Sequence, residues 1–397
     1  MSGLVFVLDW IHLLARWFHL VTGAAWIGAS FYFVWLNNNV RPIPDESGRL
    51  AGGLFAIHGG AFYEVKKYKG APEKLPDTLH WFKWEAYLTW LSGVVLLLVV
   101  YWLNADVMMA KADGPLSPTL ASLVGAGSLV VGWLVYDLLC RSPLVGHPRV
   151  LAAVGYVLIA AAAYGFSTVM NARAAYVHTG ALIGTLMAWN VFFVIIPGQR
   201  AMVGAMLEGR EPPVERGAAG ALRSLHNNYF TLPVLFIMVS NHFPFTYGHA
   251  AGWAVVAALG LLGAFVKHWM NLHERGTKAP LVLPAVAVGL IALAFVSHGP
   301  RPSSTDAHAG APPFADVKRV IEQRCATCHA QTPTQPGILE APKGYRLDVP
   351  SMWTQQAPQI HQQAVATETM PLGNLTGMTK EERALLGAWI AAGAPVE

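Results

Sequence analysis

The composition of this chain indicates a membrane protein. Of its 397 residues, 54% are hydrophobic and only 13% are charged, whereas a soluble domain carries about 25% charged residues. The net charge is +4, and because the basic residues gather in particular loops we take them as a sign of membrane topology and exclude nucleic-acid binding as their role.

Eight segments are long and apolar enough to span a bilayer, which needs about 20 residues each. The sixth is the most polar, because it contains His226, Asn227 and Asn228, and its Pro233 is tolerable only inside a bundle. We therefore predict an all-α fold, in which an eight-helix transmembrane bundle occupies residues 1–298. The predicted spans are 6–36, 84–103, 120–140, 150–170, 174–196, 222–239, 252–269 and 281–297.

The first of these segments has a polar face. His12, Arg16 and His19 follow one another at spacings of four and three, so they share one side of a helix. Such side chains are costly inside a bilayer and are usually functional, although any single histidine can also be a packing residue. Together with His178 of the fifth span, they are our predicted membrane site. A non-covalent haem b held by two helix histidines is a second possibility. The segment lacks a basic start, so we expect it to remain as a helix and not to be cleaved as a signal peptide.

Lysine and arginine counts predict the orientation. They are concentrated in the loops after the first, third, fifth and seventh spans, whereas the alternate side has only Lys111 and Arg173. By the positive-inside rule, both termini lie outside. We expect a multi-pass protein of the bacterial inner membrane with both termini in the periplasm. The basic loop residues are Arg41, Arg49, Lys66, Lys67, Lys69, Lys74, Lys83, Arg141, Arg149, Arg200, Arg210, Arg216, Arg223, Lys267, Arg275 and Lys278.

A soluble domain follows the last span. Residues 299–313 are rich in Pro, Gly, Ser and Ala, which predicts a flexible linker. In the remaining segment, 314–397, Cys325, Cys328 and His329 form a C-x-x-C-H motif. Two thiols at this spacing can bond the two vinyl groups of one porphyrin, and the adjoining imidazole can then bind its iron. We therefore predict one covalent haem c, which in bacteria is attached on the periplasmic side, in agreement with the lysine and arginine counts.

The rest of this segment resembles a small class I cytochrome c. Phe314, Val317, Val320 and Ile321 recur at helical spacing before the motif, and a T-x-x-E capping box at Thr379 precedes a last amphipathic helix. In this family Met370, followed by a proline, would be the second axial ligand beside His329. Competing ligands are Met352, Met378 and His361. An iron with both axial positions filled has no open site for substrate, so the domain is expected to transfer electrons.

Other redox and transport classes lack support in the sequence. A haem-copper oxidase would need an adjacent His-His pair within the membrane, and the chain contains none. Dinucleotide and phosphate-loop motifs are absent as well, and a transporter would not need a fused haem. Cys140, at the end of an apolar segment, is predicted to be a packing residue.

Three stretches together resemble a known family. HLLARWFHLVTGAAWIGASFYFVWLNNN opens the first span, WFKWEAYLTWLSG opens the second, and CATCHA lies in the C-terminal segment. They are similar to the bacterial membrane-bound urate oxidases (urate hydroxylases), integral membrane proteins with a periplasmic cytochrome c tail. W-I-G-x-S-F-Y is also similar to a segment of the membrane protoporphyrinogen oxidases, which favours redox chemistry.

The resemblance implies oxidation of urate to 5-hydroxyisourate in purine degradation. Electrons would leave through haem c for the respiratory chain, by way of a soluble cytochrome c or a terminal oxidase, without forming hydrogen peroxide. Urate is a planar anion, so Arg16 would clamp it while His12, His19 or His178 serves as base or haem ligand. The alternative is a membrane-anchored cytochrome c subunit that passes electrons from quinol to a terminal oxidase.

Overall fold

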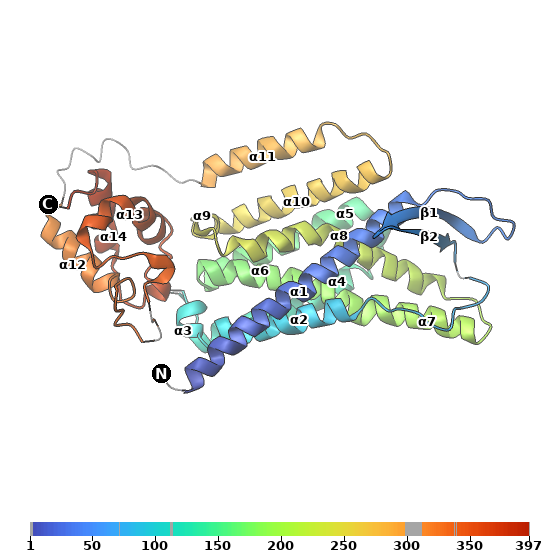
Figure 1. Ribbon diagram of the computed structural model, residues 1–397, viewed down its shortest axis with the longest axis horizontal. Helices are drawn as coiled ribbons and strands as arrows, with labels where there is room; N and C mark the ends of the chain where they lie inside the picture. The colour runs from blue at the N-terminus through green and yellow to red at the C-terminus, as the bar shows by residue number, and fades with distance from the viewer. Residues whose placement is uncertain are drawn as a thin grey trace.

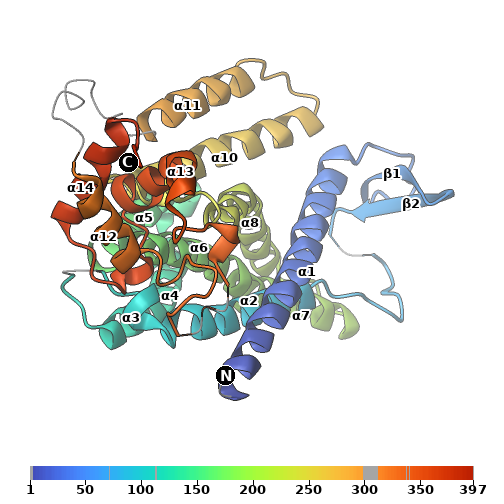
Figure 2. The same ribbon diagram turned by 60° about the vertical axis from the view of Figure 1, so that its left-hand side comes forward.

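The computed structural model describes residues 3–70, 72–111, 114–297, 312–336, 338 and 340–396. Long helices run side by side, and a smaller C-terminal domain lies at one end of them (Figures 1 and 2). We call this end of the bundle the domain end, and the opposite end, where strands β1 and β2 lie, the hairpin end. The predicted linker, 299–313, and His298 fall almost wholly outside the described residues.

The bundle contains six helices, among the residues described, that are long and apolar enough to cross a membrane. Two further predicted spans are also helical: α8 is long but contains charged and amide side chains, and α11 is apolar but has only 16 residues. The elements are α1 (Gly3–Asn39), α2 (Trp84–Leu96), η1 (Leu97–Trp102), α3 (Ala105–Met108), α4 (Pro118–Leu139), η2 (Pro143–Gly146), α5 (Pro148–Val169), α6 (Ala172–Trp189), η3 (Asn190–Ile195), α7 (Ile196–Leu207), α8 (Val214–Ser240), α9 (Pro244–Tyr247), α10 (Gly252–Glu274) and α11 (Val282–Ser297).

Burial distinguishes the helices from one another. On α1, Trp17 and Leu20 are 65% and 68% exposed, as expected of side chains that face lipid. α6 is the central helix, because most of its residues are buried against α4, α5 and α8. Two segments with π-helical hydrogen bonding, η1 and η3, interrupt the long helices. Such segments often occur at functional sites, because they rotate the side chains that follow.

A β-hairpin stands at the hairpin end, where the sequence was expected to form only a basic loop. Strands β1 (Leu50–His58) and β2 (Ala61–Tyr68) pair antiparallel, with His58 opposite Ala61. The turn is Gly59-Gly60, and both residues have positive φ (59° and 78°), as a two-residue hairpin turn of the favoured twist requires. The Gly-Gly pair was the signal for this hairpin in the sequence.

The C-terminal domain has a hydrophobic core of its own, in which Val317, Val320, Trp353, Leu386 and Trp389 are almost fully buried. The predicted first helix and the predicted capping box at the start of the last helix are both confirmed. The elements are α12 (Phe314–Arg324), η5 (Pro342–Gly344), η6 (Pro350–Met352), α13 (Trp353–Ile360), η7 (His361–Ala366), η8 (Leu372–Asn374) and α14 (Lys380–Ala391).

Candidate functional sites

The predicted stripe on α1 divides into two environments. Arg16 is exposed and donates a hydrogen bond from Nη2 to Nε2 of His12, at 2.6 Å. His19 instead faces α2, where its Nδ1 donates to the carbonyl oxygen of Thr89 at 2.9 Å and lies 3.1 Å from the hydroxyl of Ser92. The structure therefore brings His12 and Arg16 together and uses His19 in the contact between α1 and α2.

His178 is fully buried inside the bundle. Its Nδ1 donates to the carbonyl oxygen of Ala174 at 2.9 Å, and its Nε2 accepts a hydrogen bond from the indole of Trp102 at 3.2 Å. Both ring nitrogens thus have protein partners. The ring also packs edge-on against Tyr101, with ring centroids 6.2 Å apart.

Tyr101 lies at the centre of a polar group near the domain end. Its hydroxyl lies near Asn241 and within electrostatic range of Arg16, Arg173 and Tyr247. Arg173 donates to the hydroxyl of Tyr247 at 3.2 Å, and its guanidinium lies 5.7 Å from the centroid of that ring. We call these five residues the domain-end cluster. Among the residues that the structure describes, neither of its arginines forms an ion pair, and the partners they do contact are neutral.

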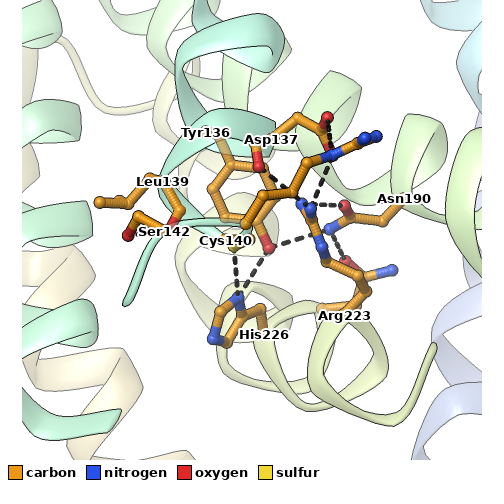
Figure 3. Close-up of polar contacts among 10 residues, drawn as sticks. Tyr136, Asp137, Leu139, Cys140, Ser142, Asn190, Arg223 and His226 are labelled. Carbon is orange, nitrogen blue, oxygen red and sulfur yellow. Dashed lines mark hydrogen bonds and ion pairs between the residues drawn. The ribbon is translucent and has the colours of Figure 1, made fainter. Parts of the chain in front are cut away.

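A second polar group lies at the hairpin end (Figure 3). Arg223 of α8 is 2% exposed, and its Nη2 lies 2.6 Å from a carboxylate oxygen of Asp137. Its Nη1 donates to the side-chain carbonyl of Asn190 at 3.1 Å, and its guanidinium lies 4.8 Å from the centroid of the Tyr136 ring. The exposed Arg141 pairs with the other carboxylate oxygen of Asp137, at 2.7 Å. A buried ion pair needs such additional partners to offset the cost of removing both charges from water.

The same group extends to a histidine and a cysteine. Asn190 donates to the Tyr136 hydroxyl at 3.1 Å, and that hydroxyl forms a second hydrogen bond, 2.7 Å long, with Nδ1 of His226. Cys140 is buried, with its sulfur 3.8 Å from the same nitrogen. We call Tyr136, Asp137, Asn190, Arg223 and His226 the hairpin-end network. It draws side chains from α4, from the first residue of η3 and from α8.

The C-x-x-C-H motif directly follows α12. Cys325, Cys328 and His329 are all partly exposed, and neither cysteine forms a disulfide. Burial raises the pKa of the Cys325 thiol to about 12 and lowers the pKa of His329. The imidazole is held by a hydrogen bond from Nδ1 to the carbonyl oxygen of Tyr345, at 3.2 Å. That bond orients the ring and leaves Nε2 as the nitrogen for a metal.

Met370 lies in a loop that Arg383 holds in place. Arg383, 7% exposed, donates to the carbonyl oxygens of Ala364 and of Met370, the latter at 2.7 Å. The thioether is partly exposed, whereas the competing Met378 is 3% exposed within the core. Burial lowers the pKa of His361, the third alternative.

These donors fit a haem better than a bare metal ion. Within the described ranges, no group of three or more His, Cys, Asp and Glu side chains is placed to hold a metal. A haem brings four ring nitrogens of its own, so it needs two thiols for attachment and two axial ligands from the protein. Two free thiols, an oriented imidazole and a partly exposed thioether are this set.

Sequence reasoning missed the roles of three residues. Arg173 and Arg223 were counted only as loop charges, and Tyr101 was counted only as part of an apolar span. Arg173 could have been singled out, because it is one of just two basic residues on the predicted outer side. No comparable signal marked Tyr101.

The fold defines the chain as a mostly helical protein, with six described helices long and apolar enough to cross a membrane and a C-terminal domain after them. The family model described as urate oxidase N-terminal matches residues 5–298, so the chain belongs to that family. Comparison with curated proteins and with solved structures yielded no match. The family supports an oxidoreductase with a role in urate oxidation.

Proposed function

We propose that the protein oxidises urate to 5-hydroxyisourate at the domain end of its bundle and passes the electrons to a haem c on the C-terminal domain. The observation that carries this proposal is the family match over residues 5–298. In the balanced reaction, urate and one water give 5-hydroxyisourate, two protons and two electrons. The site must therefore bind an anion, accept protons and lie close to an electron acceptor.

The domain-end cluster meets the first of these needs. Urate is a planar anion, and a guanidinium offers it a fixed fork of donors. Arg16 and Arg173 both lie within electrostatic range of Tyr101, and their hydrogen-bond partners are uncharged. A bound anion would supply a negative charge that neither arginine finds among the described residues. We assign both as the anion-binding residues.

His12 is the residue best placed to accept a proton. Its Nε2 accepts the hydrogen bond from Arg16, so a substrate held by Arg16 would lie beside this nitrogen. A neutral imidazole is the side chain best suited to take a proton near neutral pH. His19 and His178 are assigned as positioning residues, because they hold α2 and the Trp102–Tyr101 pair against the cluster.

The electron acceptor would be held by the C-terminal domain. Cys325 and Cys328 would attach the haem, and His329 and Met370 would be its axial ligands. When bound, the haem would supply a one-electron acceptor, so the two electrons from each urate would leave in two successive transfers, the first passed onward before the second arrives. A soluble cytochrome c or a terminal oxidase would then take the electrons onward. The predicted basic loops are at the hairpin end (Figure 1), which supports a cytoplasmic hairpin end and a periplasmic C-terminal domain in the bacterial inner membrane.

Anaerobic mixing of the purified holoprotein with urate tests the proposal. We expect urate alone to reduce the c-type absorption band, with 5-hydroxyisourate as the product by mass spectrometry. If urate leaves the band oxidised while a quinol reduces it readily, the protein is instead an electron-transfer subunit between quinol and a terminal oxidase. A pyridine haemochrome spectrum separately shows the number of haems c and whether a haem b is present.

A further inference from the structure

The C-terminal domain is seated on two short elements at the domain end of the bundle. η8 lies against α3, and η7 lies against α9. The chain between η7 and η8 contains Met370, and we call residues 367–373 the methionine segment. In Figure 1 the C-terminal domain accordingly lies beside α3 and α9. The part of the domain closest to the bundle is thus the part that carries the predicted axial methionine.

Two glycines make this close approach possible. Gly373 of η8 has a φ of 57°, and a Cβ on it would lie 2.7 Å from the carbonyl oxygen of Val107 in α3. Gly248, directly after α9, faces Thr367, and a Cβ there would overlap the Cβ of that threonine. Real Cβ atoms do not approach other atoms this closely, so a side chain introduced at either glycine would push the C-terminal domain away from the bundle.

The start of α6 holds both of these elements in place. The backbone N–H of Asn171 donates to the carbonyl oxygen of Met109, directly after α3, at 3.0 Å. Five residues later, the hydroxyl of Tyr176 donates to the carbonyl oxygen of Thr246 in α9 at 2.7 Å. Between them, Arg173 donates to Tyr247 of α9. The helix start that contributes Arg173 to the domain-end cluster therefore also positions the surface on which the C-terminal domain sits.

We propose that the methionine segment is the docking surface through which the C-terminal domain receives electrons from the domain-end cluster, and that Gly248 and Gly373 are the positioning residues that allow it to dock. This rests on the proposed function, because it specifies which face of the domain meets the electron donor. The docking itself is a property of the protein that can be measured without urate.

Gly248→Ala tests the docking, because its added methyl group would separate α9 from Thr367. We expect the amides of residues 105–110, 244–252 and 367–375 to exchange faster with deuterium in the holoprotein, as measured by mass spectrometry. Urate-driven reduction of the c-type band should slow about tenfold, which corresponds to about 1.4 kcal/mol of docking free energy. The haem content should stay unchanged. Gly165→Ala is the matched control, because a Cβ at Gly165 meets open space.

The methyl group added in Gly248→Ala would also lie 3.0 Å from the carbonyl oxygen of Pro244, so this variant could distort α9 itself. A second substitution distinguishes such a local distortion from a loss of docking. The double variant Gly248→Ala with Thr367→Gly removes the overlapping atom, and it should restore slow exchange and fast reduction relative to Gly248→Ala alone. Unchanged exchange in Gly248→Ala, or a double variant no better than the single one, would overturn the docking proposal. If slow amide exchange shows that the C-terminal domain of the wild-type protein is docked, but urate does not reduce the haem, the proposed function fails while the docking surface stands.

Discussion

The two polar groups of the bundle both contain arginine, but they satisfy it differently. In the hairpin-end network Arg223 is buried and has a carboxylate partner, Asp137, together with an amide and an aromatic ring. In the domain-end cluster the arginines, Arg16 and Arg173, contact a histidine and a tyrosine. Within the described part of the chain, arginine charge is thus neutralised by a carboxylate at the hairpin end and has no such partner at the domain end.

This difference indicates different roles for the two ends. A buried cation with a full set of partners fixes how helices pack, and removing one partner leaves the other charge buried and unpaired. A cation with neutral partners contributes less to packing than a buried ion pair does, and it attracts anions. Substitutions at the hairpin end should therefore reduce stability, whereas those at the domain end should reduce turnover.

The largest effect is expected from Arg223→Leu. It would leave Asp137 with only its exposed partner Arg141, so the free energy of unfolding should fall by about 3–5 kcal/mol. Thermal unfolding in detergent, followed by circular dichroism, measures the loss. Arg141→Leu is the matched control, because Arg141 binds the same carboxylate but is 68% exposed, and it should cost less than about 1 kcal/mol. Equal losses in the two variants would remove the distinction between a buried and an exposed partner.

Arg16→Leu and Arg173→Leu should reverse this pattern. Each removes a charged hydrogen bond to substrate, worth about 1.5–3 kcal/mol, so urate-driven haem reduction should slow about 10- to 100-fold while the melting temperature stays near that of wild type. Lysine at either position should retain part of the rate, because it keeps the charge but loses the fork. Lys111→Ala is the control for a general loss of positive charge at the same end. Wild-type rates in both leucine variants would remove these arginines from the site.

Tyr247→Phe should have a smaller effect of the same kind. It removes the hydroxyl that accepts the hydrogen bond from Arg173, and one such bond contributes about 1 kcal/mol. Because the guanidinium remains but is less well oriented, we expect KM for urate to rise about fivefold with little change in kcat. Steady-state reduction of an external cytochrome c measures both constants. A fall in kcat alone would instead place Tyr247 in the chemical step.

The smallest effect is expected at an exposed Arg–Asp pair on the C-terminal domain. A hydrogen bond from Arg346, with a second from the backbone of Gln331, lowers the pKa of Asp348 from 3.8 to about 2. A lowered pKa means that the carboxylate stabilises the folded domain above about pH 4, and that this contribution is lost as the pH falls from about 4 to 2. The melting temperature of the wild-type protein should therefore be slightly higher than that of Asp348→Asn at pH 6, and the two melting temperatures should be equal near pH 2. A difference that grows towards low pH would contradict this sign.

Much of the fold could be predicted from the sequence, because apolar length and capping signals act locally. The helix that starts at Trp84, the amphipathic helix before Cys325 and the capping box at Thr379 all lie where their patterns predicted them. The hairpin was missed although Gly59-Gly60 signalled it. The eight-span count, the haem and its ligands stay predictions.

The polar groups could be predicted only in part. Asp137, Asn190 and His226 lie near those ends of the third, fifth and sixth predicted spans that adjoin basic loops, and the structure does bring them together. Their partner Arg223 was expected on the same side only as a loop charge, and its contacts with them were not predicted, because contacts in a bundle depend on how each helix is rotated about its axis. Segment η1, which contains Tyr101, and segment η3, which begins at Asn190, change that rotation. Their π-helical hydrogen bonding has no clear signature in the residues.

The long helix from Ala172 to Leu207 contributes Arg173 to the domain-end cluster and Asn190 to the hairpin-end network, so its rise per residue gives the distance between the two groups along its axis. Its 36 residues rise about 1.5 Å each, so the rod is about 54 Å long, whereas the hydrocarbon core of a bilayer is about 30 Å thick. If Arg173 lies at one face of that core, Asn190 lies roughly 26 Å further along, close to the other face. The remaining turns, α7, must then project into the aqueous compartment. One helix would thus hold the two arginine sites on opposite leaflets and fix the distance between them, whatever the lipid around it.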